Sequence, residues 1–246
     1  MSHQSCMVRH FQYFADLSDS EIELLSTLEK SPEQLKSGDA LWREGERAEE
    51  MAVLSQGWAC SSYVLEDGSR MILDIFMPGD VVGLREYALH EHQSTVDAIT
   101  DCTFCRFPHS HLDDVFEQSG RLTSTFFAIS GIQQSMLVER MVNLGRRNAQ
   151  NRLAHFLCET RSRLSKTNSG ALNEFRLPLS QQMLADLMGL TPVHVSRVFS
   201  SLREQSLVYR DRHQITIPDI DRLQAFSDFR EGYLRMQSPP ESTRVN

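Results

Sequence analysis

Polar side chains around residue 195 are the strongest candidates for recognition chemistry in this chain. Val193, His194, Ser196, Arg197 and Ser200 alternate with apolar residues at helical spacing, so they share one face of a predicted helix. A guanidinium donates two parallel hydrogen bonds to paired acceptors, and imidazole and hydroxyl groups contact further acceptors. We find no phosphate-binding loop, no Ser/His/Asp set and no supported carboxylate pair in the sequence, so the pattern indicates binding.

Two short helices are expected to hold these side chains. Ser180 is the N-cap of the first, and Gly189 follows its last residue, where glycine is usual. Thr191 is the N-cap of the second, and Pro192 suits its first position because no N–H is needed there. Helix, glycine-containing turn and helix form the helix-turn-helix, whose second helix enters the major groove of DNA. The alternative is a helical hairpin in an ordinary α domain.

The segment that follows supports a DNA-binding domain. Residues 207–210 and 214–217 are predicted strands joined by a polar turn, the hairpin of a winged helix, and a short helix runs from Pro218-Asp219 through Phe226. Residues 1–145 hold 23 acidic and 10 basic side chains, a net charge of −13, whereas residues 146–246 hold 15 basic and 10 acidic, a net charge of +5. Only the second part is therefore expected to face phosphate.

Length and composition indicate two domains. A chain of 246 residues with 40% hydrophobic residues can bury a sizeable core. It has no run of about 18 apolar residues and no apolar signal-peptide core, so we expect a cytoplasmic protein. The five cysteines are widely spread, unlike a secreted disulfide framework.

Residues 34–108 have the pattern of an all-β domain. Turn signals such as Asp67-Gly68 and Pro78-Gly79-Asp80 recur about every ten residues. Residues 71–76 are a predicted strand that the Asp67-Gly68 hairpin pairs with residues 61–65. Predicted helices lie outside this domain, one after Ser18, one at 109–118 and one at 149–164.

The longest predicted helix, residues 121–144, carries an apolar seam at alternating spacings of four and three, typical of a coiled coil. The seam predicts a homodimer through Leu122, Phe126, Ile129, Gln133, Met136 and Arg140. A second stripe, expected to pack on the β domain, contains Ile132, Leu137, Met141 and Leu144. The alternative is a helix packed wholly within one chain.

These elements predict an α+β chain in five parts. Residues 1–17 are an arm, 18–120 a β-roll domain, 121–145 the dimerisation helix, 146–226 a winged helix and 227–246 a frayed tail.

Three stretches of the sequence carry a resemblance to a known family. They are MAVLSQGWACSSYVLEDGSRMILDIFMPGDVVGL, NAQNRLAHFLCETRSRL and LADLMGLTPVHVSRVFSSLREQSLV. Together they resemble the Crp/Fnr family of transcription regulators, over roughly residues 15–226. The resemblance implies a cyclic-nucleotide-binding-type β-roll, a long dimerisation helix and a C-terminal winged helix-turn-helix. It also implies double-stranded DNA, a second copy and RNA polymerase as partners.

The ligand residues of the cAMP-binding members are replaced in this chain. Those members carry Gly-Glu-Leu after the Pro-Gly-Asp-type turn and an Arg-Ser or Arg-Thr pair before the last strands. Here the first place is Gly83-Leu84-Arg85 and the second is His92-Gln93. An imidazole does not replace a bidentate arginine–phosphate contact, so cAMP is not expected unless Arg85 and Glu86 slide into register. The candidate effector pocket is Gly83, Arg85, Glu86, His92 and Gln93.

The cysteines do not reproduce the iron–sulfur site of the oxygen-sensing members, which use three cysteines near the N-terminus and one in the roll. Cys105 falls at the roll position, but Cys6 is alone near the N-terminus. Four thiolates are the usual requirement, so no cluster is expected. Cys102 and Cys105 point to opposite faces of a strand and are predicted to be ordinary buried cysteines.

His90-Glu91-His92 supports one enzyme hypothesis. Alternate residues of a strand share a face, so both imidazoles could bind a metal, as in cupin-type barrels. A third ligand is missing and the segment has the composition of a polar loop. We therefore expect neither a metal site nor an enzyme.

The reading helix also departs from the family motif, Glu-x-x-Ser-Arg or Glu-x-x-Gly-Arg. Here the stretch is Val193-His194-Val195-Ser196-Arg197. The resemblance implies that Arg197 contacts guanine, while Val193 can touch a thymine methyl where the family's Glu accepts from cytosine. The same alignment gives further candidates for phosphate or base contacts, which are Ser180, Gln182, Thr191, His194, Ser196, Ser200 and, at the wing tip, Arg212.

The sequence therefore predicts a homodimeric, sequence-specific DNA-binding transcription regulator on a palindromic operator. The alternative is a cyclic-nucleotide-type sensor that acts mainly through protein partners.

Overall fold

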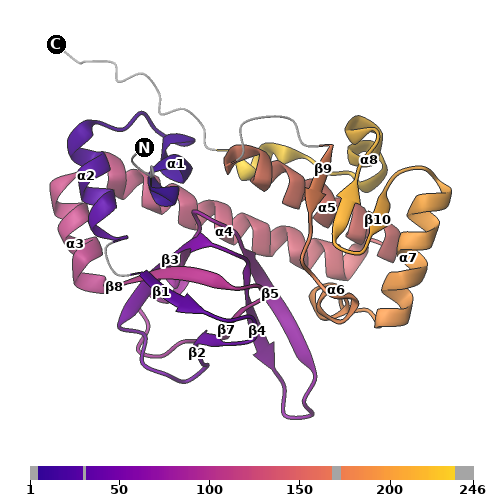
Figure 1. Cartoon of the computed structure of the whole chain (residues 1–246), viewed down its shortest axis with the longest axis horizontal. Coiled ribbons are helices and arrows are strands. Elements are labelled where there is room, and N and C mark those ends of the chain that lie inside the picture. The colour runs from indigo at the N-terminus through magenta and orange to yellow at the C-terminus, as the bar shows by residue number, and fades with distance from the viewer. Residues whose placement is uncertain (1–4, 30–31, 168–172, 236–246) are drawn as a thin grey trace.

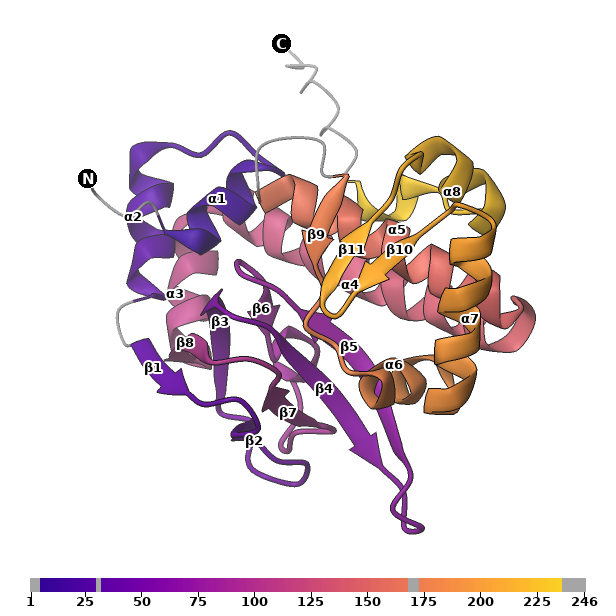
Figure 2. The ribbon, with the colours of Figure 1, turned by 45° about the vertical axis from the view of Figure 1, so that its right-hand side comes forward.

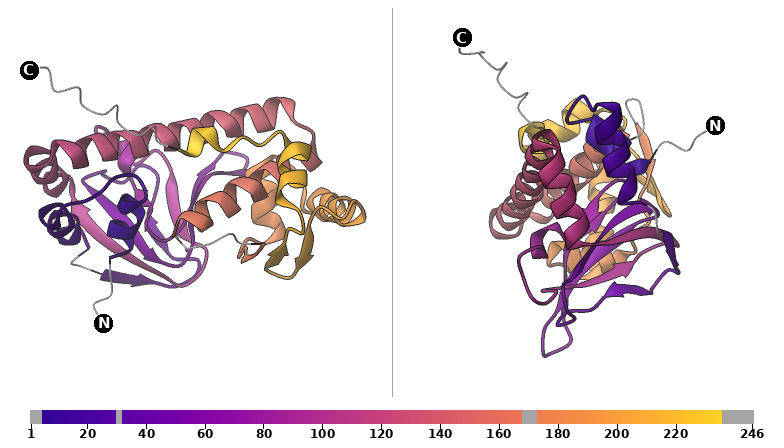
Figure 3. Two further views of the ribbon diagram at one scale, coloured as in Figure 1. Left: turned by 90° about the horizontal axis from the view of Figure 1, so that it is seen from above. Right: turned by 90° about the vertical axis from the view of Figure 1, so that its left-hand side faces the viewer.

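The computed structural model describes residues 5–29, 32–167 and 173–235. A β-roll, residues 32–108, lies at one end and a helical domain, residues 149–235, which we call the reader, lies at the other (Figure 1). Helix α4, Gly120–Arg146, runs along both (Figure 3). The α+β class, with a roll followed by a long helix and a helix-turn-helix, is as predicted.

Two antiparallel four-stranded sheets form the roll. One has the order β1 (Pro32–Leu35), β8 (Cys102–Pro108), β3 (Glu50–Gln56), β6 (Val81–Val82). The other has the order β2 (Ala40–Trp42), β7 (Thr95–Ala98), β4 (Ala59–Val64), β5 (Arg70–Phe76), so β5 is an edge strand. The predicted hairpin is present, because β4 pairs with β5 and Gly68 takes a φ of 80° in the turn. Between the sheets lie Ala52, Leu54, Val96 and Phe104, all buried.

The N-terminal segment is a packed helix rather than the predicted arm. Helix α1, Cys6–Gln12, buries Met7, Val8 and Phe11, and the Phe11 ring lies edge-on to Phe126 at 4.8 Å. Three apolar residues in one turn and a half are too few for a periodic signal, which is why the arm prediction was wrong. Helix α2, Asp19–Thr27, follows Ser18 as predicted, and Ser18 is its N-cap in a complete capping box.

Two helices follow the roll. Helix α3 is His109–Gln118, and the next residue, Ser119, lies between α3 and α4. The Ser119 hydroxyl caps α4 by accepting from the Leu122 N–H at 3.1 Å. Helix α4 ends at Arg146, and α5, Ala149–Thr167, begins after a two-residue break. The helices predicted at 109–118, 121–144 and 149–164 are thus confirmed.

The reader contains three further helices and a small sheet. Helices α6 (Gln181–Met188), α7 (Pro192–Glu204) and α8 (Ile220–Ser227) pack on α5, and the strands run β10 (Tyr209–Asp211), β11 (Gln214–Thr216), β9 (Glu174–Arg176) (Figure 2). Strand β9 was missed because it is three residues long and follows a polar loop. The predicted frayed tail is partly wrong, because the turn η2, Glu231–Leu234, buries Leu234; residues 236–246 lie outside the described residues.

Among the described helices, none has the length and apolar character that a membrane span requires.

Candidate nucleic-acid interface

The caps of the helix-turn-helix fix the direction of α7. The Ser180 hydroxyl accepts from the Met183 N–H at 3.1 Å, and the Thr191 hydroxyl accepts from the His194 N–H at 3.2 Å. Gly189 takes a left-handed φ of 60° after α6, and Pro192 is the first residue of α7. Both hydroxyls therefore serve as caps, and both residues stay exposed at the starts of their helices.

The outward face of α7 carries the predicted contact residues. Val195, Val198, Phe199 and Leu202 are buried against the reader, so the opposite side turns to solvent. On that side lie the exposed side chains of Val193, His194, Ser196, Arg197 and Ser200. Within the described part of the chain, no acceptor or carboxylate engages the Arg197 guanidinium, so its donors can meet an external partner.

Two hollows border this face. One lies between the start of α5 and the start of α7, lined by Asn148, Ala149, Gln150, Thr191, Val193, His194 and Arg197. The other lies between α7 and the wing, lined by Gln181, Ser196, Phe199, Ser200, Arg203, Arg210 and Arg212. The exposed face of α7 therefore has a hollow along each of its two flanks.

The hollow beside the wing holds three arginines with different roles. Arg210 is structural, because it donates to the Leu179 and Arg212 carbonyls at 2.9 Å and covers the Phe199 ring at 4.7 Å. Arg203 and Arg212 are exposed, and Arg212 takes a φ of 51° in the wing turn. Sequence reasoning missed Arg203, although Ser196, Ser200 and Arg203 have the i, i+4, i+7 spacing of one helical row.

Gln182 has one side-chain N–H engaged within the reader. Its Nε2 donates to Oδ1 of Asp186 at 2.6 Å, which leaves its second N–H and its carbonyl for other partners. The side chain is exposed on the first turn of α6.

The predicted effector residues separate into two groups. Gly83, Arg85 and Glu86 line a cavity of about 350 Å³ between the roll and α4, together with Asp74, Ser94 and Gln133. His92 and Gln93 do not line it. Gly83 takes a left-handed φ of 91°, and a Cβ atom added at this position would lie only 3.2 Å from the Trp42 ring. Both observations explain why the residue is glycine.

His92, which the resemblance aligns with a phosphate-binding arginine, is turned into the protein. Its ring stacks on Trp42 at 4.1 Å, and its Nδ1 lies 3.1 Å from Oε2 of the buried Glu86. Arg85 lines the cavity, but its Nη2 is shared between Ser94 at 3.1 Å and Glu86 at 3.4 Å. The cation that a cyclic phosphate would need on this wall is thus already hydrogen-bonded within the roll.

Among the described residues, the side chains of four cysteines are buried, namely Cys60, Cys102, Cys105 and Cys158. Burial raises the pKa of Cys60 and of Cys158 to about 12, so both are thiols at neutral pH.

The predicted dimer seam faces the protomer's own domains, which corrects the sequence prediction. Leu122, Phe126, Ile129 and Met136 are buried, Gln133 donates to the Val81 carbonyl at 3.1 Å, and Arg140 donates to Asp74 at 2.9 Å. The second stripe was also partly wrong, because Met141 is exposed rather than packed on the roll. Spacings of four and three recur on adjacent faces of one helix, so the pattern alone does not tell which face is inward.

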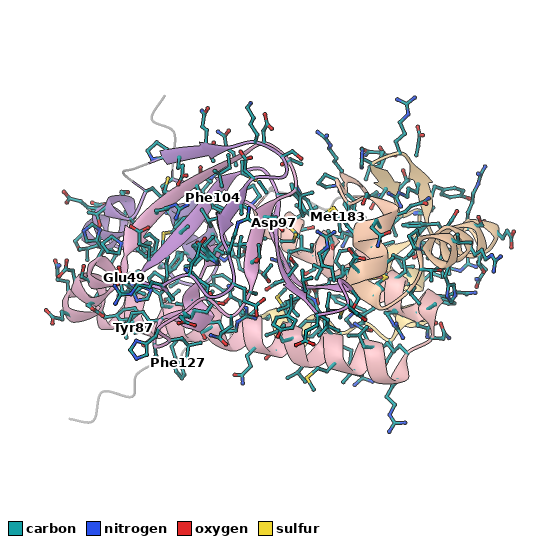
Figure 4. All side chains as sticks on the ribbon, turned by 90° about the horizontal axis from the view of Figure 1, so that it is seen from below. Glu49, Tyr87, Asp97, Phe104, Phe127 and Met183 are labelled. Atoms are coloured by element: carbon teal, nitrogen blue, oxygen red, sulfur yellow. The ribbon has the colours of Figure 1, made fainter. Side chains whose placement is uncertain are left out.

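A different row of α4 is left uncovered. It carries the exposed side chains of Phe127, Val138 and Met141, and Figure 4 shows Phe127 at the outer edge of the molecule. With these, exposed small or polar residues complete a repeat of three and four, in the order Ser124, Phe127, Gly131, Gln134, Val138, Met141 and Gly145. We call this row the outer seam.

Comparison with known proteins agrees with this geometry. Residues 32–119 match the cyclic nucleotide-binding domain family, and residues 151–226 match the family of the Crp-like helix-turn-helix domain. The chain is 28% identical over 216 residues to the transcriptional activatory protein AadR of Rhodopseudomonas palustris, covering 87% of this chain and 85% of that protein.

Two further relatives come from Bradyrhizobium. The nitrogen fixation regulation protein FixK of Bradyrhizobium diazoefficiens is 28% identical over 222 residues, covering 90% of this chain and 92% of that protein. The structure of FixK2 from Bradyrhizobium japonicum superposes with a TM-score of 0.71 at 25% identity, covering 85% of this chain and 98% of that chain.

Proposed function

This chain belongs to the Crp/Fnr family of transcription regulators, and we propose that it binds a palindromic operator as a homodimer through the outward face of α7. One observation carries the proposal: Arg197 stands exposed and without an internal partner among the described residues, on a capped helix that projects from the reader. Its guanidinium has the donor geometry that reads guanine in the major groove. Val193, His194, Ser196 and Ser200 supply the neighbouring contacts.

Phosphate contacts come from the residues around α7. Ser180, Gln182 and Thr191 lie exposed at or near the starts of α6 and α7, and Arg203 and Arg212 line the hollow beside the wing. The net charge of +5 on residues 146–246 supports this assignment.

The outer seam supplies the two-fold symmetry. A second copy packed against Phe127, Val138 and Met141 in parallel register would place both readers at the same end, because α7 lies near the C-terminal end of α4 (Figures 1 and 3). Two reading helices then reach half-sites about one helical turn apart, some 34–36 Å. RNA polymerase is the proposed further partner and the cytoplasm the proposed location.

Operator selection followed by binding measurements tests the proposal. Duplexes enriched by the full-length protein from a random pool should contain an inverted repeat. Arg197→Ala should weaken binding to that site by about 1–3 kcal/mol, roughly 5- to 150-fold, and leave non-specific binding nearly unchanged.

Arg230→Ala is the matched control, because Arg230 is an exposed arginine of the same domain, outside α7 and the wing. It should bind the operator like the wild type. An enriched pool without an inverted repeat, or full affinity in Arg197→Ala, would contradict the proposal. Either result would favour the alternative, a sensor that acts mainly through protein partners.

A further inference from the structure

The roll contacts the helix-turn-helix directly. Arg70, the first residue of β5, donates from Nε to Oδ2 of Asp186 on α6 at 2.9 Å, and its Nη2 lies 2.8 Å from the same oxygen in an ion pair. The two residues are 116 positions apart in the sequence, and the Asp186 side chain is 10% exposed. Helix α6 lies beside β5 where this pair forms (Figure 2).

Asp186 connects this contact to a candidate DNA-binding residue. While Oδ2 accepts from Arg70, Oδ1 accepts from Nε2 of Gln182 at 2.6 Å. Gln182 lies one helical turn earlier on the same side of α6. A single carboxylate of the reader therefore holds both a sensor-domain arginine and a glutamine of the proposed DNA interface.

Two more ion pairs hold the reader and α4 to the same edge of the roll. Arg163 of α5 donates to Asp80 at 2.7 Å and to the Ile75 carbonyl at 2.9 Å. Arg140 of α4 contacts Asp74 at 2.9 Å, the Leu73 carbonyl, and Glu159 of α5 at 3.7 Å. Burial alone would lower the pKa of Arg163, but Asp80, Asp74 and Glu159 raise it overall.

Apolar side chains also pack between the roll and the reader. Ile72, Ile75 and Met77 of the roll belong to the same buried cluster as Leu157 of α5 and Leu184 of α6. The reader is therefore packed in one orientation against the roll, and in that orientation the outward face of α7 is exposed.

We propose that Arg70 is a positioning residue for DNA binding, which acts through Asp186 to hold α6 and Gln182 in the orientation that engages the operator. The inference rests on the proposed function and adds a residue of the sensor domain to it. Without Arg70, the Asp186 carboxylate loses its contact with the roll, so α6 and the Gln182 that Asp186 holds are less firmly oriented. The fraction of molecules in the binding orientation then falls, and the apparent affinity falls with it.

A double-mutant cycle on the full-length dimer tests this inference. Arg70→Ala and Asp186→Asn should each weaken binding to the selected operator by about fivefold to tenfold. The variant that carries both substitutions should bind the operator as well as the single variant with the lower affinity does. Arg70→Ala should also shrink the effect of Gln182→Ala, because both act through Asp186. A residue that only stabilises the fold would give effects that multiply.

Arg47→Ala is the matched control, because Arg47 pairs with Glu49 at 3.0 Å on the open surface of the roll. Light scattering should show dimers for every variant. Thermal unfolding checks that each variant is folded at the assay temperature, because Arg70→Ala leaves the 10% exposed Asp186 carboxylate without its ion-pair partner.

The outcomes separate this inference from the proposed function. If the wild type selects no inverted repeat, the proposed function fails. If the wild type selects one and Arg70→Ala binds it equally well, or if the effects of Arg70→Ala and Gln182→Ala multiply, the positioning role alone is overturned.

Discussion

Phe127 and Ile129 lie two residues apart on α4, yet the Phe127 side chain is 83% exposed and the Ile129 side chain is 4% exposed. Ile129 packs with Phe126 and Val81 inside the protomer, whereas Phe127 has solvent on the opposite side. The helix therefore packs one apolar face against its own domain and leaves another exposed, where we propose that a second copy binds. Phe127, Val138 and Met141 are three large apolar side chains left exposed along one row of this helix.

A glutamate in the outer seam should separate the protomers. Val138→Glu places like charges across a buried two-fold interface, where unpaired carboxylates are costly, so we expect monomers and loss of operator binding. Sedimentation velocity measures the mass directly. Val64→Glu is the matched control, because Val64 on β4 is 50% exposed and Val138 is 53% exposed. A dimeric Val138→Glu would show that α4 does not form the interface, and Ile129→Glu should instead unfold the roll.

Val193 should determine the base preference of the reading helix. Val193→Glu recreates the Glu-x-x-Ser-Arg pattern, and its carboxylate would accept from a cytosine amino group. We expect selection of operators by this variant to move toward cytosine at one symmetric position in each half-site. The control is Val193→Gln, because Gln is isosteric with Glu but its amide pairs with adenine, so this variant should not produce that preference. Unchanged selection by Val193→Glu would remove residue 193 from the base contacts.

The N-terminal helix should contribute to the stability of the roll. Phe11 is fully buried against Phe126, so Phe11→Ala should lower the free energy of unfolding by about 3–5 kcal/mol. Tyr13→Ala removes an aromatic side chain that is 45% exposed, two residues later, and should lower the free energy of unfolding by clearly less. Urea denaturation measures both, and equal effects would indicate that α1 does not pack as described.

Stability should fall in mild acid because of His155. Burial lowers its pKa to about 4, so the folded protein keeps the ring neutral while the unfolded chain protonates it near pH 6.5. Between these values the unfolded state binds the extra proton, so the free energy of unfolding falls as the pH drops from about 6.5 to about 4. The full effect is up to about 3 kcal/mol.

His155→Phe should remove this contribution while keeping a ring against Phe229 and Tyr233. Urea titrations at pH 7 and pH 4.5 should then show a smaller pH dependence in the variant than in the wild type. Parallel pH profiles for the two proteins would mean that His155 does not titrate between the folded and unfolded states.

Cyclic nucleotides should not switch the protein. The His92 ring is stacked on Trp42 and paired with Glu86, and Arg85 is already shared with Ser94 and Glu86. We expect no saturable heat and no gain in operator affinity when cAMP or cGMP is titrated to millimolar concentration. Saturable heat with a large gain in affinity would identify Arg85 as a phosphate ligand.

The parts of the fold that local chemistry determines could be predicted from the sequence. Ser180, Gly189, Thr191 and Pro192 define the helix-turn-helix because each acts on backbone groups within a few residues. The orientation of α4 depends on long-range packing, and both its inward and outward rows satisfy the same spacing. His92 shows the same limit, because its burial depends on Trp42, fifty positions earlier in the sequence.

Strand β5 ends its sheet without a neighbouring strand, and its backbone carbonyls at Leu73 and Ile75 accept instead from Arg140 and Arg163. Two guanidinium groups thus occupy acceptors that would otherwise pair with a strand from another molecule. The same arginines that attach the helices to the roll therefore also block self-association through this edge. Separating the roll from α5 exposes an aggregation-prone template, so a shortened roll should precipitate where the full chain does not.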